Sequence, residues 1–171
     1  MKKSTVIIVW GLITGIASSV FYLFLNMSDN MNSGLSYISW IIIFAGLLVG
    51  ALQYRKANNG HLTFGEGYTA GILMTLIIAV IGTISFFIYL NGHPDFSQKM
   101  MDMQRTKMVN KGMSEDQIEM AMKMASKFMS STSMIIFGFF GSIVTGAILS
   151  LLSSGITMKK PPIDGENTTN A

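Results

Sequence analysis

Four long apolar runs that contain no Asp, Glu, Lys or Arg limit what this chain can fold into. Each run has roughly 18 to 23 residues, and a helix of that length spans a hydrocarbon core of about 30 Å. Only 12% of the 171 residues are charged, whereas a soluble domain needs charged residues along its helices. We therefore predict an all-α integral membrane protein with four transmembrane helices at 6–25, 35–52, 68–90 and 134–152.

The first run starts like a secretory signal peptide, because Lys2 and Lys3 precede the apolar residues and small residues follow at 17–19. The apolar region of a signal peptide ends after about 7 to 15 residues. Here the apolar run resumes after the small residues and reaches the width of a bilayer. We expect a retained first span.

Small residues recur at every fourth position within the runs. In the fourth run they are Gly138, Ser142, Gly146, Ser150 and Ser154. In the other runs they are Gly11, Gly15, Gly46, Gly50, Gly67 and Gly71. Residues at this spacing share one helix face, and helices in lipid associate where small residues let their backbones approach. We predict that these faces are helix-packing surfaces, which either hold the four helices together or also bind a second copy or another membrane protein.

The long segment between the third and fourth runs predicts an amphipathic two-helix insertion. A proline near its start and a glycine stop predict a first helix over 94–111. A Ser-x-x-Gln capping box predicts a second helix over 115–131. The hydroxyl residues at 130–133 either cap the fourth span or let the second helix continue into it.

The second insertion helix is rich in methionine. Its apolar face contains Ile118, Ala121, Met122, Ala125, Phe128 and Met129, and charged side chains follow the opposite face. Thioethers are ligands that suit Cu(I), but Met120 and Met124 point away from Met122. We predict that this helix lies on the membrane surface or against the bundle and that the chain holds no metal. A Met-rich protein that handles Cu(I) is one alternative.

Thr63 and Glu66 have the spacing of a capping box at the start of the third run. A carboxylate at the edge of the membrane is also a candidate proton or cation site. We expect the capping role, because no run contains a second ionisable group.

Basic residues near the ends of the runs indicate the orientation. On one side of a four-span chain lie Lys2, Lys3, Arg55, Lys56, Lys159 and Lys160. Basic residues are enriched on the cytoplasmic side, so we expect both termini in the cytoplasm. We expect one membrane domain over 1–160 and a disordered polar tail over 161–171.

The sequence contains no pattern typical of catalysis. His61 and His93 fall on opposite predicted sides of the membrane, cysteine is absent, and serine needs a positioned base. We expect no enzymatic activity, no catalytic or cofactor-binding residues and, given a net charge of only +3, no nucleic-acid partner. A small transporter is another alternative, although the runs lack the charges and proline breaks on which transporters depend.

Three short patterns resemble one bacterial membrane family. They are residues 63–68 followed by Gly71, the break at 93–96 and the joint at 112–115. Together with the order of the four spans, they are similar to the bacterial family catalogued as domain of unknown function four-one-nine-nine, over roughly residues 1–160. The resemblance implies a four-span protein of the bacterial inner membrane and supplies no site residues. We expect a non-enzymatic membrane protein that serves as a packing, scaffold or accessory subunit.

Overall fold

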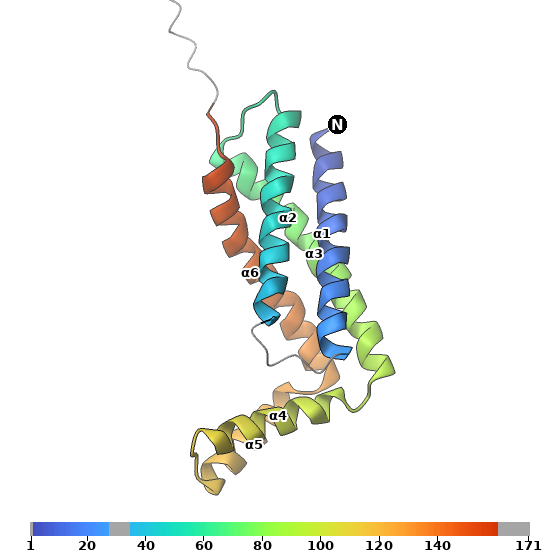
Figure 1. Cartoon of the computed structure of the whole chain (residues 1–171), viewed down its shortest axis with the longest axis vertical. Coiled ribbons are helices and arrows are strands. Elements are labelled where there is room, and N and C mark those ends of the chain that lie inside the picture. Colours follow the sequence, from blue (N-terminus) through green and yellow to red (C-terminus); the bar gives the residue numbers. More distant parts are fainter. Residues whose placement is uncertain (1, 28–34, 161–171) are drawn as a thin grey trace, which may run out of the picture.

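The structure, a computed structural model, describes residues 2–27 and 35–160 and contains six helices within those ranges (Figure 1). They are α1 Lys3–Met27, α2 Ser36–Ala57, α3 Phe64–Gly92, α4 Phe96–Asn110, α5 Glu115–Phe128 and α6 Ser131–Thr157. The prediction of an all-helical chain is confirmed for this part of the molecule. Most of the connection between the first two spans, and the predicted tail, lie outside the described residues.

Four of the helices, α1, α2, α3 and α6, are long and apolar enough to cross a membrane. Their outward faces carry large apolar side chains. One such residue from each helix is 62 to 65% exposed, namely Val20, Ile41, Ile88 and Ile156. A lipid bilayer would cover these side chains, whereas water would not be a suitable solvent for so large an apolar surface. The prediction of four long apolar spans is confirmed.

The four long helices form a bundle in which α1 and α6 lie diagonally opposite one another (Figure 1). Both α2 and α3 pack against these two helices and, over a smaller area, against each other. The core lies at this central contact, where Leu47 of α2 packs with Met74 and Ile78 of α3. Trp10 of α1 and Leu149 of α6 pack against the same cluster, so all four helices contribute to it.

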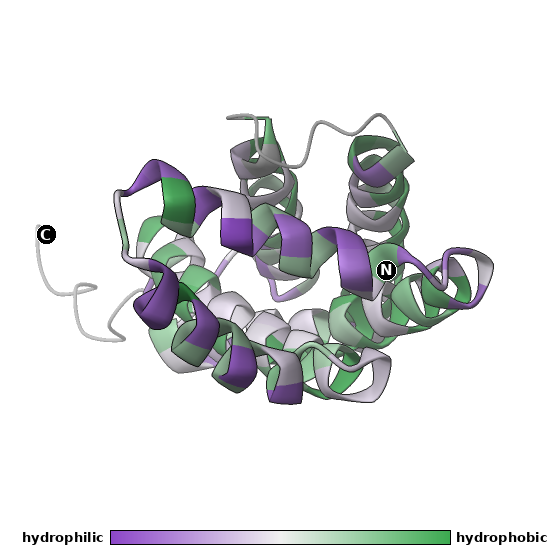
Figure 2. Cartoon of the chain, turned by 90° about the horizontal axis from the view of Figure 1, so that it is seen from below, coloured by the Kyte–Doolittle hydropathy of each residue, from purple (hydrophilic) through white to green (hydrophobic). Residues whose placement is uncertain are grey.

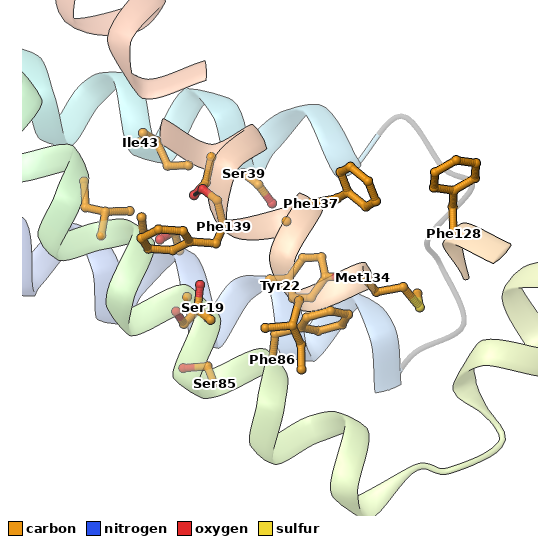
Figure 3. A pocket seen from close by; sticks show the side chains of 18 of the residues that line it. Ser19, Tyr22, Ser39, Ile43, Ser85, Phe86, Phe128, Met134, Phe137 and Phe139 are labelled. Atoms are coloured by element: carbon orange, nitrogen blue, oxygen red, sulfur yellow. Dashed lines mark hydrogen bonds between the residues drawn. The ribbon is translucent and has the colours of Figure 1, made fainter. Parts of the chain in front are cut away.

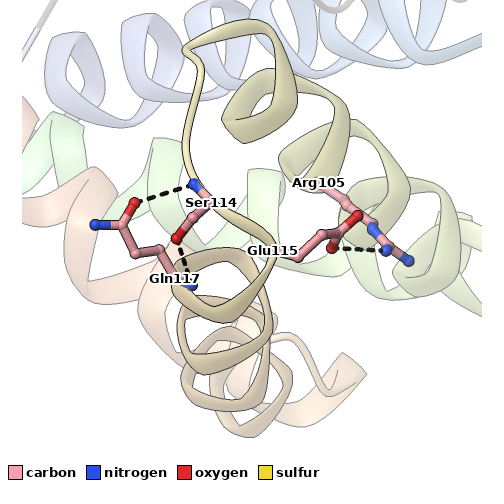
Figure 4. A network of polar contacts seen from close by, with 4 residues as sticks. All are labelled: Arg105, Ser114, Glu115 and Gln117. Atoms are coloured by element: carbon pink, nitrogen blue, oxygen red, sulfur yellow. Dashed lines mark hydrogen bonds and ion pairs between the residues drawn. The ribbon is translucent and has the colours of Figure 1, made fainter.

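Helices α4 and α5 form a hairpin that extends sideways from one end of the bundle (Figure 1). At the start of α5, the Ser114 hydroxyl accepts a hydrogen bond from the Gln117 N–H, and the Gln117 side chain accepts one from the Ser114 N–H (Figure 4). Arg105 of α4 pairs with Glu115 of α5 at 3.4 Å. Hydrophilic residues are prominent on the side of the hairpin that faces away from the bundle (Figure 2).

Aromatic contacts attach both ends of the hairpin to the bundle. Phe96, at the start of α4, is 4% exposed and lies edge-on to Phe86 and Tyr89 of α3. The Phe128 ring, at the end of α5, lies 5.7 Å from the Phe137 ring of α6, centre to centre. The hairpin is therefore held at the end of the bundle where α3 ends and α6 begins.

A serine cap separates the second insertion helix from the fourth span. The Ser130 hydroxyl accepts a hydrogen bond from the Ser133 N–H at 3.2 Å, which starts α6 at Ser131. Helix α5 consequently ends at Phe128 and does not reach residue 131. At the other end of the insertion, α4 begins at Phe96, because Pro94 and Asp95 form a turn before the helix.

Candidate functional site: an apolar pocket between the spans

The small residues of α3 and α6 meet one another along part of their length. The contacts are Gly67 with Ser154, Gly71 with Ser150, and Thr75 with Gly146. A Cβ added at Gly71 would lie 2.6 Å from the Ser150 hydroxyl, and one added at Gly146 would overlap the Thr75 side chain. The two backbones approach here as closely as glycine allows, which is how helices associate in lipid.

Toward the hairpin, the same two rows of small residues separate. The next positions at the same spacing are Ala79 and Thr83 on α3, and Ser142 and Gly138 on α6. A Cβ added at Gly138 would have no neighbour within 4 Å among the described residues. All four residues line a cavity, and at Gly138 there is no close contact of the kind seen at Gly71. Helices that touch at one end and diverge at the other leave this space between them.

The cavity has a volume of about 760 Å³ and is lined by residues from all four spans and from the end of α5 (Figure 3). Small-molecule sites typically have volumes of about 300 to 1,000 Å³. Its aromatic lining residues are Tyr22, Phe86, Phe128, Phe137 and Phe139. Among the described residues that line it, none carries a charge.

Hydroxyl groups interrupt the apolar lining, and the two buried serines among them, Ser18 and Ser19, differ in their hydrogen bonding. The Ser18 hydroxyl donates to the Thr14 carbonyl at 2.8 Å, and the Ser142 hydroxyl donates to the Phe139 carbonyl at 2.7 Å. Ser19 is only 7% exposed, and its hydroxyl has no hydrogen-bond partner among the described residues. A buried polar group without a partner costs roughly 1 to 3 kcal/mol. Ser19 is thus an unused hydrogen-bonding position in the cavity wall.

The opposite end of the bundle is closed by polar contacts. Arg55 donates to the last backbone carbonyl of α6 at 3.1 Å, where a cation also interacts favourably with the helix dipole. Leu62 and Lys159 exchange two backbone hydrogen bonds of 2.8 Å, which fasten the α2–α3 connection to the chain that leaves α6. The Lys3 ammonium lies 5.8 Å from the centre of the Tyr54 ring. Basic residues from three parts of the chain therefore gather at this end.

Thr63 and Glu66 form a capping box at the start of α3, also at the closed end. The Thr63 hydroxyl accepts from the Glu66 N–H at 3.3 Å, and the Glu66 carboxylate accepts from the Thr63 N–H at 3.0 Å. The Asn58 amide donates to the other carboxylate oxygen at 3.2 Å. These hydrogen bonds hold the Glu66 carboxylate at the start of α3, where it contributes to local structure. Glu66 does not line the cavity.

The glycines of α1 and α2 lie against side chains of neighbouring helices. Their nearest partners are Ile77 for Gly11, Ile81 for Gly15, Thr14 for Gly46 and Met74 for Gly50. These four glycines therefore pack against other helices of the same chain, as do the α3 glycines Gly67 and Gly71. Among the residues predicted to pack helices, Gly138 and Ser142 differ, because both line the cavity.

The methionines of α5 point in different directions. Met120 and Met124 are 70% and 62% exposed, whereas Met122 is half-buried and faces the space between α4 and α5. The two histidines are also far apart, since His61 precedes α3 and His93 follows it. The exposed thioethers of Met120 and Met124 therefore do not converge with that of Met122, and the two imidazoles lie at opposite ends of α3.

The cavity was missed by reasoning from the sequence. The signal that was available is the concentration of phenylalanines near the hairpin end of α3 and α6, among them Phe86, Phe137 and Phe139. Large rings beside small residues hold helices apart, whereas small residues alone bring them together. The four-residue spacing of small residues carries no information about these rings.

Together, the fold and the cavity define a helical membrane protein with four spans and a helical hairpin between the third and the fourth. Residues 9–159 match the family model described as "Protein of unknown function (DUF4199)", so the chain belongs to this family and the resemblance is confirmed. No curated protein and no solved structure matches the chain.

Proposed function

We propose that this chain is a non-enzymatic protein of the bacterial inner membrane that binds an uncharged, lipid-soluble molecule between its spans. The observation that carries the proposal is the cavity of about 760 Å³, whose described lining residues are all uncharged. Apolar cavities with a few polar groups are the usual form of small-molecule sites. An uncharged ligand fits best, because an unpaired charge in apolar surroundings is costly.

The chemistry of the lining favours binding over catalysis or ion-coupled transport. A serine nucleophile needs a positioned base, and transporters commonly place ionisable groups inside the membrane. The ionisable residues that the sequence offers as candidates do not line the cavity. His61 and His93 lie at opposite ends of α3, and Glu66 belongs to the capping box. The Ser19 hydroxyl, which has no partner among the described residues, remains available as a hydrogen-bonding group.

The closed, basic end of the bundle is proposed to face the cytoplasm, in keeping with the enrichment of basic residues on that side. The cavity and the hairpin then lie toward the outer surface. The chain has no cysteine, so in a single-cysteine variant the maleimide labels the introduced cysteine alone. A membrane-impermeant maleimide added to spheroplasts should label Asn110→Cys, and should label Lys160→Cys only after lysis. The reverse pattern would contradict this orientation.

Gly82 provides a test of the binding proposal. It lines the cavity, and an added Cβ has no neighbour within 4 Å in the described part of the chain, so Gly82→Leu fills the space without a backbone clash there. Gly141→Leu is the matched control, because Gly141 is equally open but does not line the cavity. Mass spectrometry of polymer-extracted protein should recover a neutral molecule with the wild type and with Gly141→Leu, and not with Gly82→Leu. Equal recovery from all three proteins would contradict the proposal.

Packing against another membrane helix is a second candidate function, favoured by the exposed face of α6. A Cβ added at Gly141 would meet no described residue within 4 Å, and Phe137 and Phe140 beside it are 56% and 61% exposed. A small residue between large apolar ones suits close approach of a helix from a second copy or from another subunit. Oxidative cross-linking of Gly141→Cys in native membranes should then give a covalent dimer or a mixed complex. A monomer by both cross-linking and blue-native electrophoresis would contradict this role.

A further inference from the structure

We infer that Ser19 binds the polar group of the molecule in the cavity, and that this group is the carbonyl oxygen of a neutral lipid. The inference rests on the proposed binding function and names the class of ligand. It starts from the difference between two adjacent serines of α1, both of which line the cavity.

Ser18 and Ser19 have the same side chain but different hydrogen bonding. The Ser18 hydroxyl lies 2.8 Å from the carbonyl oxygen of Thr14 and 3.2 Å from that of Gly15, so its proton is already donated within α1. The Ser19 hydroxyl is more than nine-tenths buried and has no partner among the described residues. It lies at the wall of the cavity with Tyr22 of its own helix and Phe86 of α3 (Figure 3). An acceptor on a bound molecule would complete its hydrogen bonding.

Other buried hydroxyls do not offer the same opportunity. Thr75 and Ser150 also lack partners within the described part of the chain, but both lie where α3 and α6 are in close contact, and neither lines the cavity. Ser19 lines the cavity, whereas these two residues do not, so Ser19 is the one of the three that borders a bound ligand. The unused donor therefore belongs to a residue next to the unfilled space.

The surroundings of Ser19 define what kind of acceptor fits. A carboxylate or phosphate would be unpaired, because no described residue of the lining is cationic. A pure hydrocarbon would leave the hydroxyl without a partner. An uncharged carbonyl, as in a ketone, an ester or a quinone, accepts the hydrogen bond and brings no charge. The aromatic rings of Tyr22 and Phe86, 6.1 Å apart and edge-on to each other, supply an apolar wall for the rest of the molecule.

The test compares two probes that differ by one oxygen, hexadecan-2-one and hexadecane. Binding of each to the full-length protein in nonionic detergent is measured by native mass spectrometry. We expect the wild type to bind the ketone about 2- to 12-fold more tightly, which corresponds to one neutral hydrogen bond. Ser19→Ala should remove this preference and leave the affinity for hexadecane unchanged. Ser19→Thr, which retains the hydroxyl, should keep the preference.

Ser18→Ala is the matched control and should behave like the wild type, because the Ser18 hydroxyl is already satisfied. Circular dichroism of each variant verifies that it is folded. The inference is overturned if the wild type does not prefer the ketone, if Ser19→Ala retains the preference, or if Ser18→Ala loses it to the same extent. In those cases the binding of hexadecane would still support the proposed function. If neither probe binds the wild type, both the inference and the proposed function are refuted.

Discussion

Replacing Gly146 by alanine tests whether the contact between α3 and α6 depends on the absence of a side chain. The new Cβ would overlap the Thr75 side chain, whose own Cβ would lie 2.9 Å away. Thr75 is only 3% exposed and is branched at Cβ, so it has little freedom to rotate away. Overpacking of this kind costs about 1 to 3 kcal/mol. We expect Gly146→Ala to lower the free energy of unfolding by that amount.

The matched control is Gly141→Ala on the same helix, where an added Cβ has no neighbour within 4 Å over residues 2–27 and 35–160. Changes at such open positions usually stay within about 0.5 kcal/mol. Reversible unfolding in mixed micelles with increasing SDS, followed by circular dichroism, measures both variants. A neutral Gly146→Ala, or an equal loss of stability in Gly141→Ala, would refute the packing argument.

Three further predictions concern the two ends of the bundle. Arg55→Ala should lower the free energy of unfolding by about 1 to 2 kcal/mol, because the last carbonyl of α6 loses its donor and the helix dipole its cation; unchanged stability in SDS titrations would contradict this. Thr63→Ala should lower the free energy of unfolding by about 1 kcal/mol in the same titrations, because it removes the N-cap of α3. A larger loss of stability from Glu66→Gln than from Thr63→Ala would contradict the capping role of Thr63. A spin label at Phe128, which is 56% exposed beside α6, should be relaxed mainly by oxygen dissolved in lipid, and full access to a water-soluble nickel reagent would exclude docking of α5 at the membrane.

The number and type of the long helices could be predicted because the bilayer imposes a simple condition on the sequence. An uninterrupted apolar run of sufficient length has to be helical in lipid, since every backbone group must be paired within the segment. The helix ends were less predictable, because they depend on single hydrogen bonds. Ser130 illustrates this: the sequence allowed it to cap α6 or to lie inside one continuous helix, and its hydrogen bond to the Ser133 N–H in the structure makes it a cap.

The cavity was not predictable from the spacing of small residues. That spacing is the same at Gly146, where α3 and α6 touch, and at Gly138, where they do not. The difference arises from the large rings near these small residues, among them Phe137 and Phe139 of α6, and from the crossing of the helices, neither of which the four-residue spacing encodes. The unused hydroxyl of Ser19 was equally hidden, because Ser18 and Ser19 look identical in the sequence and are distinguished by their hydrogen bonds.

The central claim is that the cavity selects a particular neutral molecule from the membrane, and photo-cross-linking in living cells tests it most directly. The photoreactive residue p-benzoylphenylalanine is placed at Phe86, which lines the cavity, and separately at Phe140, which is 61% exposed on the outer face of α6. Intact-mass measurement then identifies what each position captures. The account predicts one neutral adduct of defined mass at Phe86 and a mixture of bulk phospholipids at Phe140. The same phospholipid mixture at both positions would contradict it.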